Sequence, residues 1–110
     1  MKKMLKLALI AAAAAAAFGA SAQEFPAKDK TVTIVVPFAA GGPTDRVARD
    51  LAEALRKPLG ATVVVDNTAG AGSSIGAARV ARATPDGYTL LLNHIGMSTM
   101  PALYRKLSFS

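Results

Sequence analysis

The sequence contains no cysteine, a single histidine and few aromatic residues, which make up 5% of its 110 residues. Without cysteine the chain has no disulfide framework and no thiolate metal site. It also lacks the clustered lysine and arginine, interleaved with aromatic side chains, that is typical of nucleic-acid binding. No metal-ligand spacing occurs among its motifs. We therefore expect no metal, no cofactor and no nucleic-acid partner.

The scarcity of histidine also constrains catalysis. A serine triad would need His94 to meet both a nucleophile and an acid, and no Gly-x-Ser-x-Gly elbow is present. His94 lies near the end of an apolar segment and could touch a ligand, but a packing role in a loop is the simpler interpretation. We predict no catalytic residue and no enzymatic activity. A secreted α/β enzyme fragment, similar to a hydrolase, remains the alternative.

The first 22 residues contain the three parts of a secretory signal peptide. Three lysines precede an apolar region at residues 7–18, and Ala20-Ser21-Ala22 supplies a small-x-small cleavage site. The apolar region is shorter than the ~20 residues of a membrane span, which argues against a membrane anchor. No cysteine follows the site, so a lipoprotein anchor is excluded. We expect cleavage before Gln23 and a periplasmic protein of 88 residues, with a formal charge of +3 in place of +6.

The most informative stretch runs from a β-branched segment through a glycine loop into a helix. Residues 31–36 (TVTIVV) predict a strand buried on both faces, as in parallel sheets. Gly41-Gly42 follows, and an amphipathic pattern begins at Pro43. Because a helix start presents free backbone N–H groups and a positive dipole end, this junction suits a carboxylate or phosphate. A tight turn that binds nothing is the alternative. Asp45 fits a helix-start residue that holds the loop in shape.

Strands and helices alternate along the rest of the chain. We predict a helix at 43–57, whose buried face consists of Val47, Ala48, Leu51, Ala52 and Leu55. A second buried strand at 61–66 and a helix at 75–83, capped by Ser73 or Ser74, follow it. The chain then continues with a strand at 88–92, a loop at 93–99 and a helical turn from Pro101. Right-handed β-α-β-α-β connections give an α/β fold with a parallel sheet of order 2-1-3. The loops after the strands then share the carboxyl edge of the sheet, where such folds bind ligands.

The second glycine-rich loop, residues 70–76 (GAGSSIG), partly matches a dinucleotide-binding fingerprint. Its third glycine comes one residue late, and the next strand ends in Leu92-Asn93 with no acidic residue for a ribose. The loop also belongs to the second β-α unit. These departures argue against a nicotinamide cofactor.

Four motifs follow one another along the chain: residues 36–49 (VPFAAGGPTDRVAR), 67–77 (NTAGAGSSIGA), 85–91 (PDGYTLL) and 101–107 (PALYRKL). In this order they resemble the first motif, the second loop, the third signature and the segment after the third strand of the Bug-type periplasmic receptors, the solute-binding components of tripartite tricarboxylate transporters. Each motif is modest alone, but all four in order, together with a signal peptide, are specific.

The resemblance implies two α/β domains with a cleft between them, similar to type II periplasmic binding proteins. It implies that backbone groups and ordered water at the first β-α loop hold a ligand carboxylate, together with a loop of the second domain. The implied ligand-binding residues are Phe38, Ala39, Ala40, Gly41, Gly42, Pro43, Thr44, Asp45, Ala71, Gly72, Ser73 and Ser74. The implied partners are a small carboxylate and the membrane permease subunits, and the implied full-length receptor is monomeric.

The sequence departs from the family pattern in three places and in length. Ser73-Ser74 stand where a glycine and an asparagine are common, which could alter the ligand pocket. Met100 replaces a common asparagine, and residues 108–110 replace a Pro-Tyr-Asp-like ending. Family members are much longer, so we expect residues 23–110 to form only the first part of domain I, with the second domain missing. A truncated product without function is a further alternative.

Overall fold

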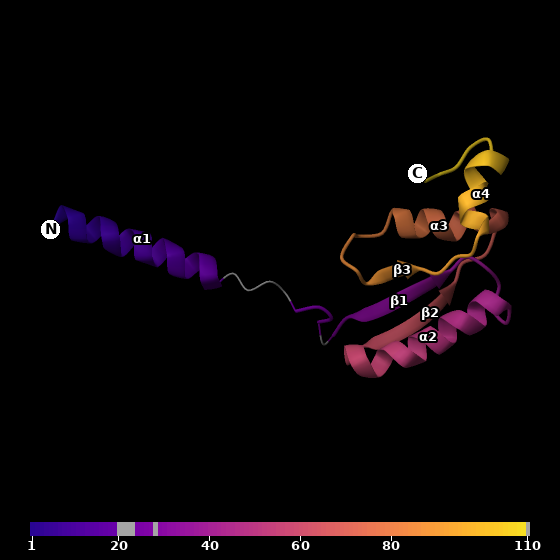
Figure 1. The fold of residues 1–110 in the computed structure, drawn as a ribbon, viewed down its shortest axis with the longest axis horizontal. Coiled ribbons are helices and arrows are strands. Elements are labelled where there is room, and N and C mark those ends of the chain that lie inside the picture. The colour runs from indigo at the N-terminus through magenta and orange to yellow at the C-terminus, as the bar shows by residue number, and fades with distance from the viewer. Residues whose placement is uncertain (20–23, 28, 110) are drawn as a thin grey trace.

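The computed structural model describes residues 1–19, 24–27 and 29–109. In chain order the elements are α1 (Lys2–Gly19), β1 (Thr31–Val36), α2 (Pro43–Leu59), β2 (Thr62–Asn67), the 3-10 helix η1 (Ala71–Ser73), α3 (Ser74–Ala81), β3 (Thr89–Leu91) and α4 (Gly96–Leu103) (Figure 1). The expected alternation of strands and helices is confirmed. The predicted cleavage site, Ala20-Ser21-Ala22 before Gln23, lies outside the described residues.

The first helix, α1, contains the basic and apolar regions of the predicted signal peptide. Its alanine run favours helix, since alanine has the highest intrinsic helix propensity. Large apolar side chains along it are exposed, including Leu5, Leu9 and Ile10. None of the helices in the described parts of the chain is long and apolar enough to span a membrane.

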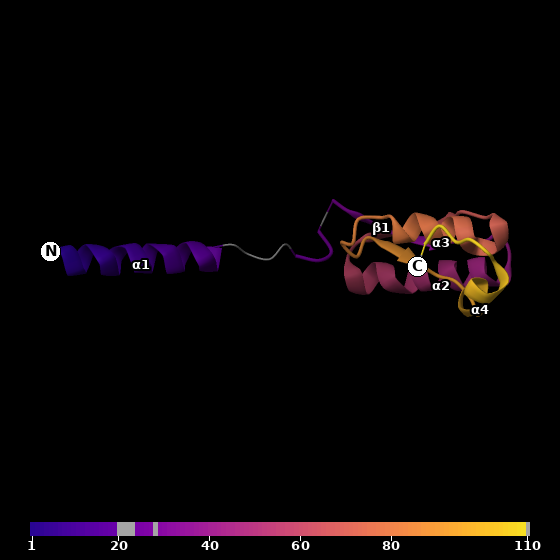
Figure 2. The same ribbon diagram turned by 90° about the horizontal axis from the view of Figure 1, so that it is seen from above.

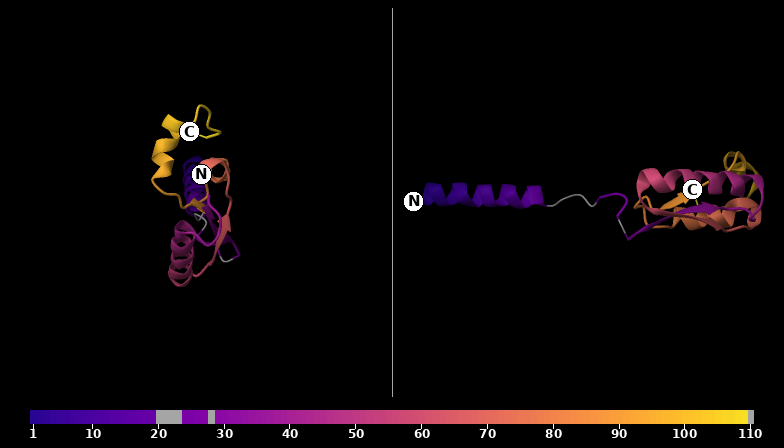
Figure 3. Two further views of the ribbon diagram at one scale, coloured as in Figure 1. Left: turned by 90° about the vertical axis from the view of Figure 1, so that its right-hand side faces the viewer. Right: turned by 90° about the horizontal axis from the view of Figure 1, so that it is seen from below.

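The three strands form a parallel sheet in the order β2-β1-β3, as predicted. β1 pairs with β2 from Thr31–Thr62 to Val36–Asn67, and its middle residues pair with β3. Helices α2 and α3 lie on opposite sides of this sheet (Figures 1 and 2). The view along the longest axis shows α2 and α4 on opposite sides of the strands (Figure 3, left). The loops that follow β1, β2 and β3 therefore lie at one edge.

The core lies between the central strand and α2. Alternate residues of β1 face α2 and join a buried cluster with residues of α2 and β2: Val32, Ile34, Val36, Ala48, Ala52 and Val63. Val35, on the other face of β1, is also fully buried. The expected burial of this strand on both faces is therefore confirmed.

The buried face of α2 differs from the prediction at two positions. Ala48 and Ala52 are buried, but Val47 is 56% exposed and Leu51 is 37% exposed. The helix instead turns Asp45, Ala48 and Ala52 toward the sheet, a stripe with the three- and four-residue spacing of one helix face. Val47 and Leu51 each come one residue before a member of that stripe, which places them about a quarter-turn around the helix from it.

The second strand is less buried than expected. Val63 is fully buried against α2, whereas Val64, which points to the other face, is 39% exposed. β2 is an edge strand, and α3 packs against β1 and β3. The prediction of a buried strand is therefore correct only for the face that α2 covers.

Helix boundaries also differ at proline residues. α2 continues to Leu59, so Pro58 lies in its last turn, and Gly60 ends the helix by donating its N–H to the carbonyl of Arg56 over 2.9 Å. α4 begins at Gly96, inside the predicted loop, and contains Pro101. The hydroxyls of Ser98 and Thr99 donate to carbonyls three residues earlier, at 2.7 and 3.0 Å, which supports this short helix.

Helix α3 approaches the end of β1 closely because Gly76 has no side chain. A Cβ atom at Gly76 would lie 2.6 Å from Pro37 Cβ and 2.8 Å from the carbonyl oxygen of Thr68. Gly76 is the glycine that comes one residue late for a dinucleotide fingerprint, and here it allows α3 to pack closely on the end of β1.

Candidate functional site

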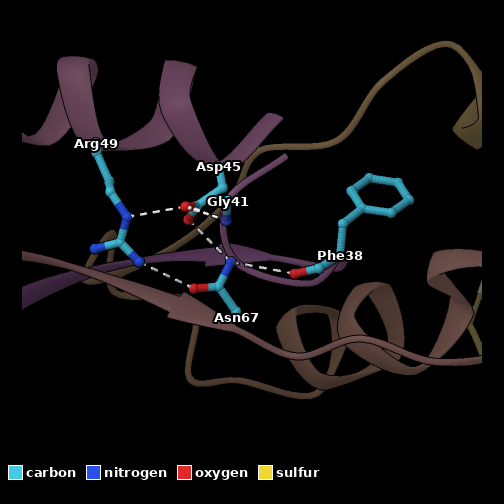
Figure 4. A network of polar contacts seen from close by, with 5 residues as sticks. All are labelled: Phe38, Gly41, Asp45, Arg49 and Asn67. Carbon is cyan, nitrogen blue, oxygen red and sulfur yellow. Dashed lines mark hydrogen bonds and ion pairs between the residues drawn. The ribbon is translucent and has the colours of Figure 1, made fainter. Parts of the chain in front are cut away.

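The loop after β1 is held in place by the Asp45 carboxylate (Figure 4). Oδ2 accepts hydrogen bonds from the backbone N–H of Gly41, at 2.8 Å, and from Nε of Arg49, at 3.0 Å. Oδ1 accepts a hydrogen bond from Nδ2 of Asn67, at 3.0 Å. The prediction that Asp45 holds the loop is confirmed. It does so through a loop N–H, that of Gly41, and not through the first helical turn.

These bonds stabilise the ionised form of a buried carboxylate. Hydrogen bonds from Arg49, Gly41 and Asn67 lower the pKa of Asp45 to about 2, although burial acts in the opposite direction. The carboxylate is therefore ionised at neutral pH and paired with Arg49. Both of its oxygens already bond to protein groups, so we assign Asp45 to anchoring the loop; a direct ligand contact stays a prediction.

A concavity of about 450 Å³ opens beside this loop, at the carboxyl edge of the sheet. We call it the first-loop concavity; it is lined by Phe38, Ala39, Gly42, Pro43, Thr44, Asp45 and His94. The structure thus brings together most of the first-loop residues predicted to bind ligand. Of the others, Gly41 lines adjacent depressions of the surface, and Ala40 lies in the same loop and is exposed.

The start of α2 brings residues with unpaired backbone donors to the lining of this concavity. Gly42 is the N-cap residue, no side chain caps the helix, and Pro43 has no N–H to offer. Among the hydrogen bonds of the described residues, none uses the backbone N–H of Gly42, Thr44 or Asp45. The positive end of the helix dipole adds to these donors, so the geometry suits a carboxylate oxygen. The seven described lining residues include no lysine or arginine.

His94 lines the concavity, although the sequence interpretation favoured a packing role. Both descriptions apply, because its ring stacks on Phe38 with centroids 4.4 Å apart and planes 14° apart. Its Nδ1 accepts a hydrogen bond from the N–H of Gly96, at 2.9 Å. The signal in the sequence was the position of His94 just after β3, since the order β2-β1-β3 places that end next to the loop after β1.

The second glycine loop, residues 71–74, does not line the first-loop concavity. Ser73 is buried, and its hydroxyl donates to the sulfur of Met100, at 3.7 Å, and accepts from Nδ2 of Asn93, at 3.5 Å. Ser73 occupies the predicted N-cap position of α3 but makes no capping bond. The hydroxyl of Ser74 donates to the carbonyl of Ala71, at 2.9 Å. Ligand contact by this loop stays a prediction.

Arg79 and Asp66 form an ion pair with a structural role. Arg79 on α3 bonds to Asp66, at 2.7 Å, and to the hydroxyl of Thr68, at 2.8 Å, linking α3 to the end of β2. Within the described ranges, no three side chains of the histidine, cysteine, aspartate and glutamate types come together to hold a metal ion.

Comparison with known sequences identifies relatives over most of the chain. Residues 47–110 match the family model of the tripartite tricarboxylate transporter family receptor. A UPF0065 protein of Agrobacterium vitis is 59% identical over 78 residues, which are 71% of this chain and 22% of that protein. Protein BugT of Bordetella pertussis is 42% identical over 103 residues, which are 88% of this chain and 31% of that protein.

Solved structures give the same result. The periplasmic binding protein BugD superposes with a TM-score of 0.73 at 57% identity, over 76% of this chain and 28% of that one. MatC of Rhodopseudomonas palustris, with bound malate, superposes with a TM-score of 0.72 at 48% identity, over 77% of this chain and 29% of that one. An R. palustris protein with adipate superposes with a TM-score of 0.72 at 36% identity, over 79% of this chain and 29% of that one. This chain spans less than a third of the length of each.

The fold and the sequence relatives indicate the same protein family. The three-stranded sheet superposes on periplasmic binding proteins, and the family model covers more than half of the chain. The resemblance found in the sequence is therefore confirmed, and the chain belongs to the Bug-type receptor family of the tripartite tricarboxylate transporters.

Proposed function

We propose that this chain is a periplasmic solute-binding receptor that captures a small mono-, di- or tricarboxylate and passes it to the membrane permease subunits of a tripartite transporter. The observation that carries the proposal is the first-loop concavity: its lining includes Gly42, Thr44 and Asp45, whose backbone N–H groups make no hydrogen bond among the described residues, and includes no lysine or arginine. The relatives solved with malate and adipate support a carboxylate as the ligand class.

In this proposal one carboxylate end of the ligand lies against residues 39–44. Backbone N–H groups and the α2 dipole stabilise its charge, and Gly42 lets the ligand approach the main chain. Recognition by backbone donors tolerates many ligand bodies. The rest of the ligand is then selected by the loop after β3, by Ala71 and Gly72 at the same edge, and by a second domain.

We further propose residues 1–22 as a signal peptide and residues 23–110 as the first part of domain I of a monomeric two-domain receptor. The arrangement of charge and apolar residues before Gln23 supports the first assignment. The share of the relatives that this chain matches supports the second. Mass spectrometry of periplasmic material tests the cleavage; we expect a mature N-terminus at Gln23, and an intact Met1 there would refute it.

The binding proposal is tested by titrating the isotope-labelled chain with malate or adipate and following its amide signals by NMR. We expect saturable shifts of the Gly42, Thr44 and Asp45 signals below ~10 mM ligand, where a dissociation constant of about 1 mM approaches saturation. The Gly60 signal, at the other end of α2, serves as an internal control. Chloride at equal ionic strength controls for salt. Absence of saturable shifts with every carboxylate would refute the proposal.

A variant makes this test specific to the loop. Gly42 has an extended backbone with φ −82° and ψ 176°, so Gly42→Val fits the main chain while its side chain fills the concavity. We expect carboxylate affinity to fall at least tenfold, or ~1.4 kcal/mol. Ala54→Val, on the exposed side of the same helix, is the matched control and should leave affinity unchanged.

A further inference from the structure

We propose that His94 binds the ligand directly, donating a hydrogen bond from Nε2 to a second oxygen group of the carboxylate ligand. The proposal rests on the proposed function of the first-loop concavity. His94 is the sole lining residue with a side-chain nitrogen among the seven that the structure describes there. It comes from the loop after β3, whereas the backbone donors come from the start of α2. The concavity therefore has donors on two separate elements.

The tautomer of His94 is set by its neighbour Gly96. Nδ1 accepts the backbone N–H of Gly96 at 2.9 Å, and a nitrogen that accepts a hydrogen bond carries no hydrogen. The neutral ring therefore bears its hydrogen on Nε2. No hydrogen bond among the described residues uses Nε2, and the residue is exposed. Nε2–H is thus a donor without a protein partner at a lining position.

Two contacts hold the imidazole ring. Phe38 stacks on one face, and Nδ1 accepts the backbone N–H of Gly96 at 2.9 Å. Phe38 itself belongs to the first loop, and its carbonyl accepts a hydrogen bond from Asn67 at 3.1 Å. The donor is therefore held relative to the first loop before a ligand arrives, which reduces the entropic cost of binding.

This arrangement favours one chemical class among the carboxylates. His94 also lines a second concavity of about 260 Å³, together with the start of α2 and the side chains of Val47 and Leu92, so space for the body of a ligand continues past His94. A ligand with one carboxylate at α2 and another oxygen group along its body satisfies both donors. We infer a preference for di-, tri- or hydroxycarboxylates over simple aliphatic monocarboxylates.

The test compares malate with butyrate, a four-carbon monocarboxylate, in the wild-type chain and three variants. His94→Asn keeps an acceptor for Gly96 but loses the distal donor, His94→Phe keeps the stack on Phe38 without either nitrogen, and His94→Gln restores a donor near the Nε2 position. A hydrogen bond to a charged group is stronger than one between neutral groups. We therefore expect malate affinity to fall about tenfold or more in the Asn and Phe variants, with most of it restored in the Gln variant.

The outcomes separate this inference from the proposed function. Malate affinity should fall by a much larger factor than butyrate affinity in the Asn and Phe variants, and the side-chain nitrogen signal of Nε2 in wild type should shift with malate and not with butyrate. Equal malate affinity in wild type and in the Asn and Phe variants, or an unmoved Nε2 signal, would overturn the role of His94 alone. If malate and butyrate both leave the Gly42 amide of wild type unmoved, the proposed function fails and this inference fails with it.

Discussion

Asn67, the last residue of β2, donates a hydrogen bond from Nδ2 to Oδ1 of Asp45, in the first turn of α2, over 3.0 Å. The same amide donates to the carbonyl of Phe38 at 3.1 Å. One side chain therefore positions both the carboxylate that anchors the loop and the residue that stacks on His94. The shape of the first-loop concavity thus depends on a strand that contributes no residue to its lining.

Loss of the Asn67 side chain should destabilise this loop. Asn67→Ala leaves the carbonyl of Phe38 and one oxygen of Asp45 without their donor, which typically costs about 1–3 kcal/mol. We expect that decrease in the free energy of unfolding, measured by urea denaturation. Asp50→Ala, on the exposed side of α2, is the control and should change stability by no more than about 0.5 kcal/mol. Equal stability of the two variants would contradict the role of Asn67.

The Asp45 network should make stability depend on pH under acid conditions. The pKa of Asp45 is lowered from its ordinary 3.8 to about 2 in the folded chain, so the unfolded chain binds a proton at higher pH than the folded one. The contribution to stability is fully present above pH 4 and is lost as the pH falls from about 4 to 2. Urea denaturation across this range measures it.

Asp45→Asn provides the control for that titration. The difference in unfolding free energy between wild type and this variant should be constant above pH 4 and should shrink toward pH 2, because the variant has no carboxylate to titrate at this position. A difference that stays constant down to pH 2 would show that Asp45 has an ordinary pKa in the folded chain.

Stability and binding should change in opposite directions at Gly42. Gly42→Ser places a hydroxyl at the N-cap, where it accepts a hydrogen bond from the N–H of Thr44 or Asp45 and stabilises the helix by a few tenths of a kcal/mol. That N–H is then withdrawn from a ligand, so malate should bind about tenfold more weakly. Gly42→Ala adds a Cβ without a hydroxyl and should bind better than the Ser variant. Thermal unfolding and NMR titration measure the two effects.

Gly41 is a poorer probe of the same site. A side chain there meets open space, but φ is +91°, which strains residues with a Cβ. A β-branched substitution at Gly41 would therefore act through the backbone before it crowded a ligand. Gly42 has no such strain, and this makes it the better test position.

The close contact at Gly76 should make that position intolerant of even a methyl group. Gly76→Ala drives a Cβ against Pro37 and the carbonyl of Thr68, both of which are held by the backbone. Overpacking of this kind costs about 1–3 kcal/mol, which lowers the melting temperature by ~4–8 °C per kcal/mol in a domain of this size. Gly42→Ala is the control, because its nearest neighbour would be 3.8 Å away. A Gly76→Ala variant as stable as that control would contradict the packing argument.

The sequence by itself determined the order of elements and the sheet topology. Local patterns were sufficient, because the β-branched residues of β1 and β2 favour strands, and Pro43 and Gly60 fit the start and end of a helix. The short right-handed connections then allowed the order β2-β1-β3 to be predicted. The position of the first loop at the carboxyl edge followed from that order.

Only the tertiary structure decided which side chains meet at that edge. Hydrophobic spacing predicted Val47 and Leu51 as buried, but α2 turns Asp45 toward Gly41 and Asn67, and Val47 and Leu51 are exposed. The hydroxyl of Ser73 turns to Met100 and leaves the helix uncapped.

The contacts of His94 are the clearest example of an arrangement that local sequence patterns do not predict. Its stacking partner Phe38 lies on a different β-α unit, and its tautomer depends on the N–H of Gly96 in the turn that follows. Periodicity and capping rules describe residues within a few positions of each other, whereas contacts between loops depend on how the strands are paired and how the helices are rotated on them. The composition of the first-loop concavity is therefore a property of the assembled sheet.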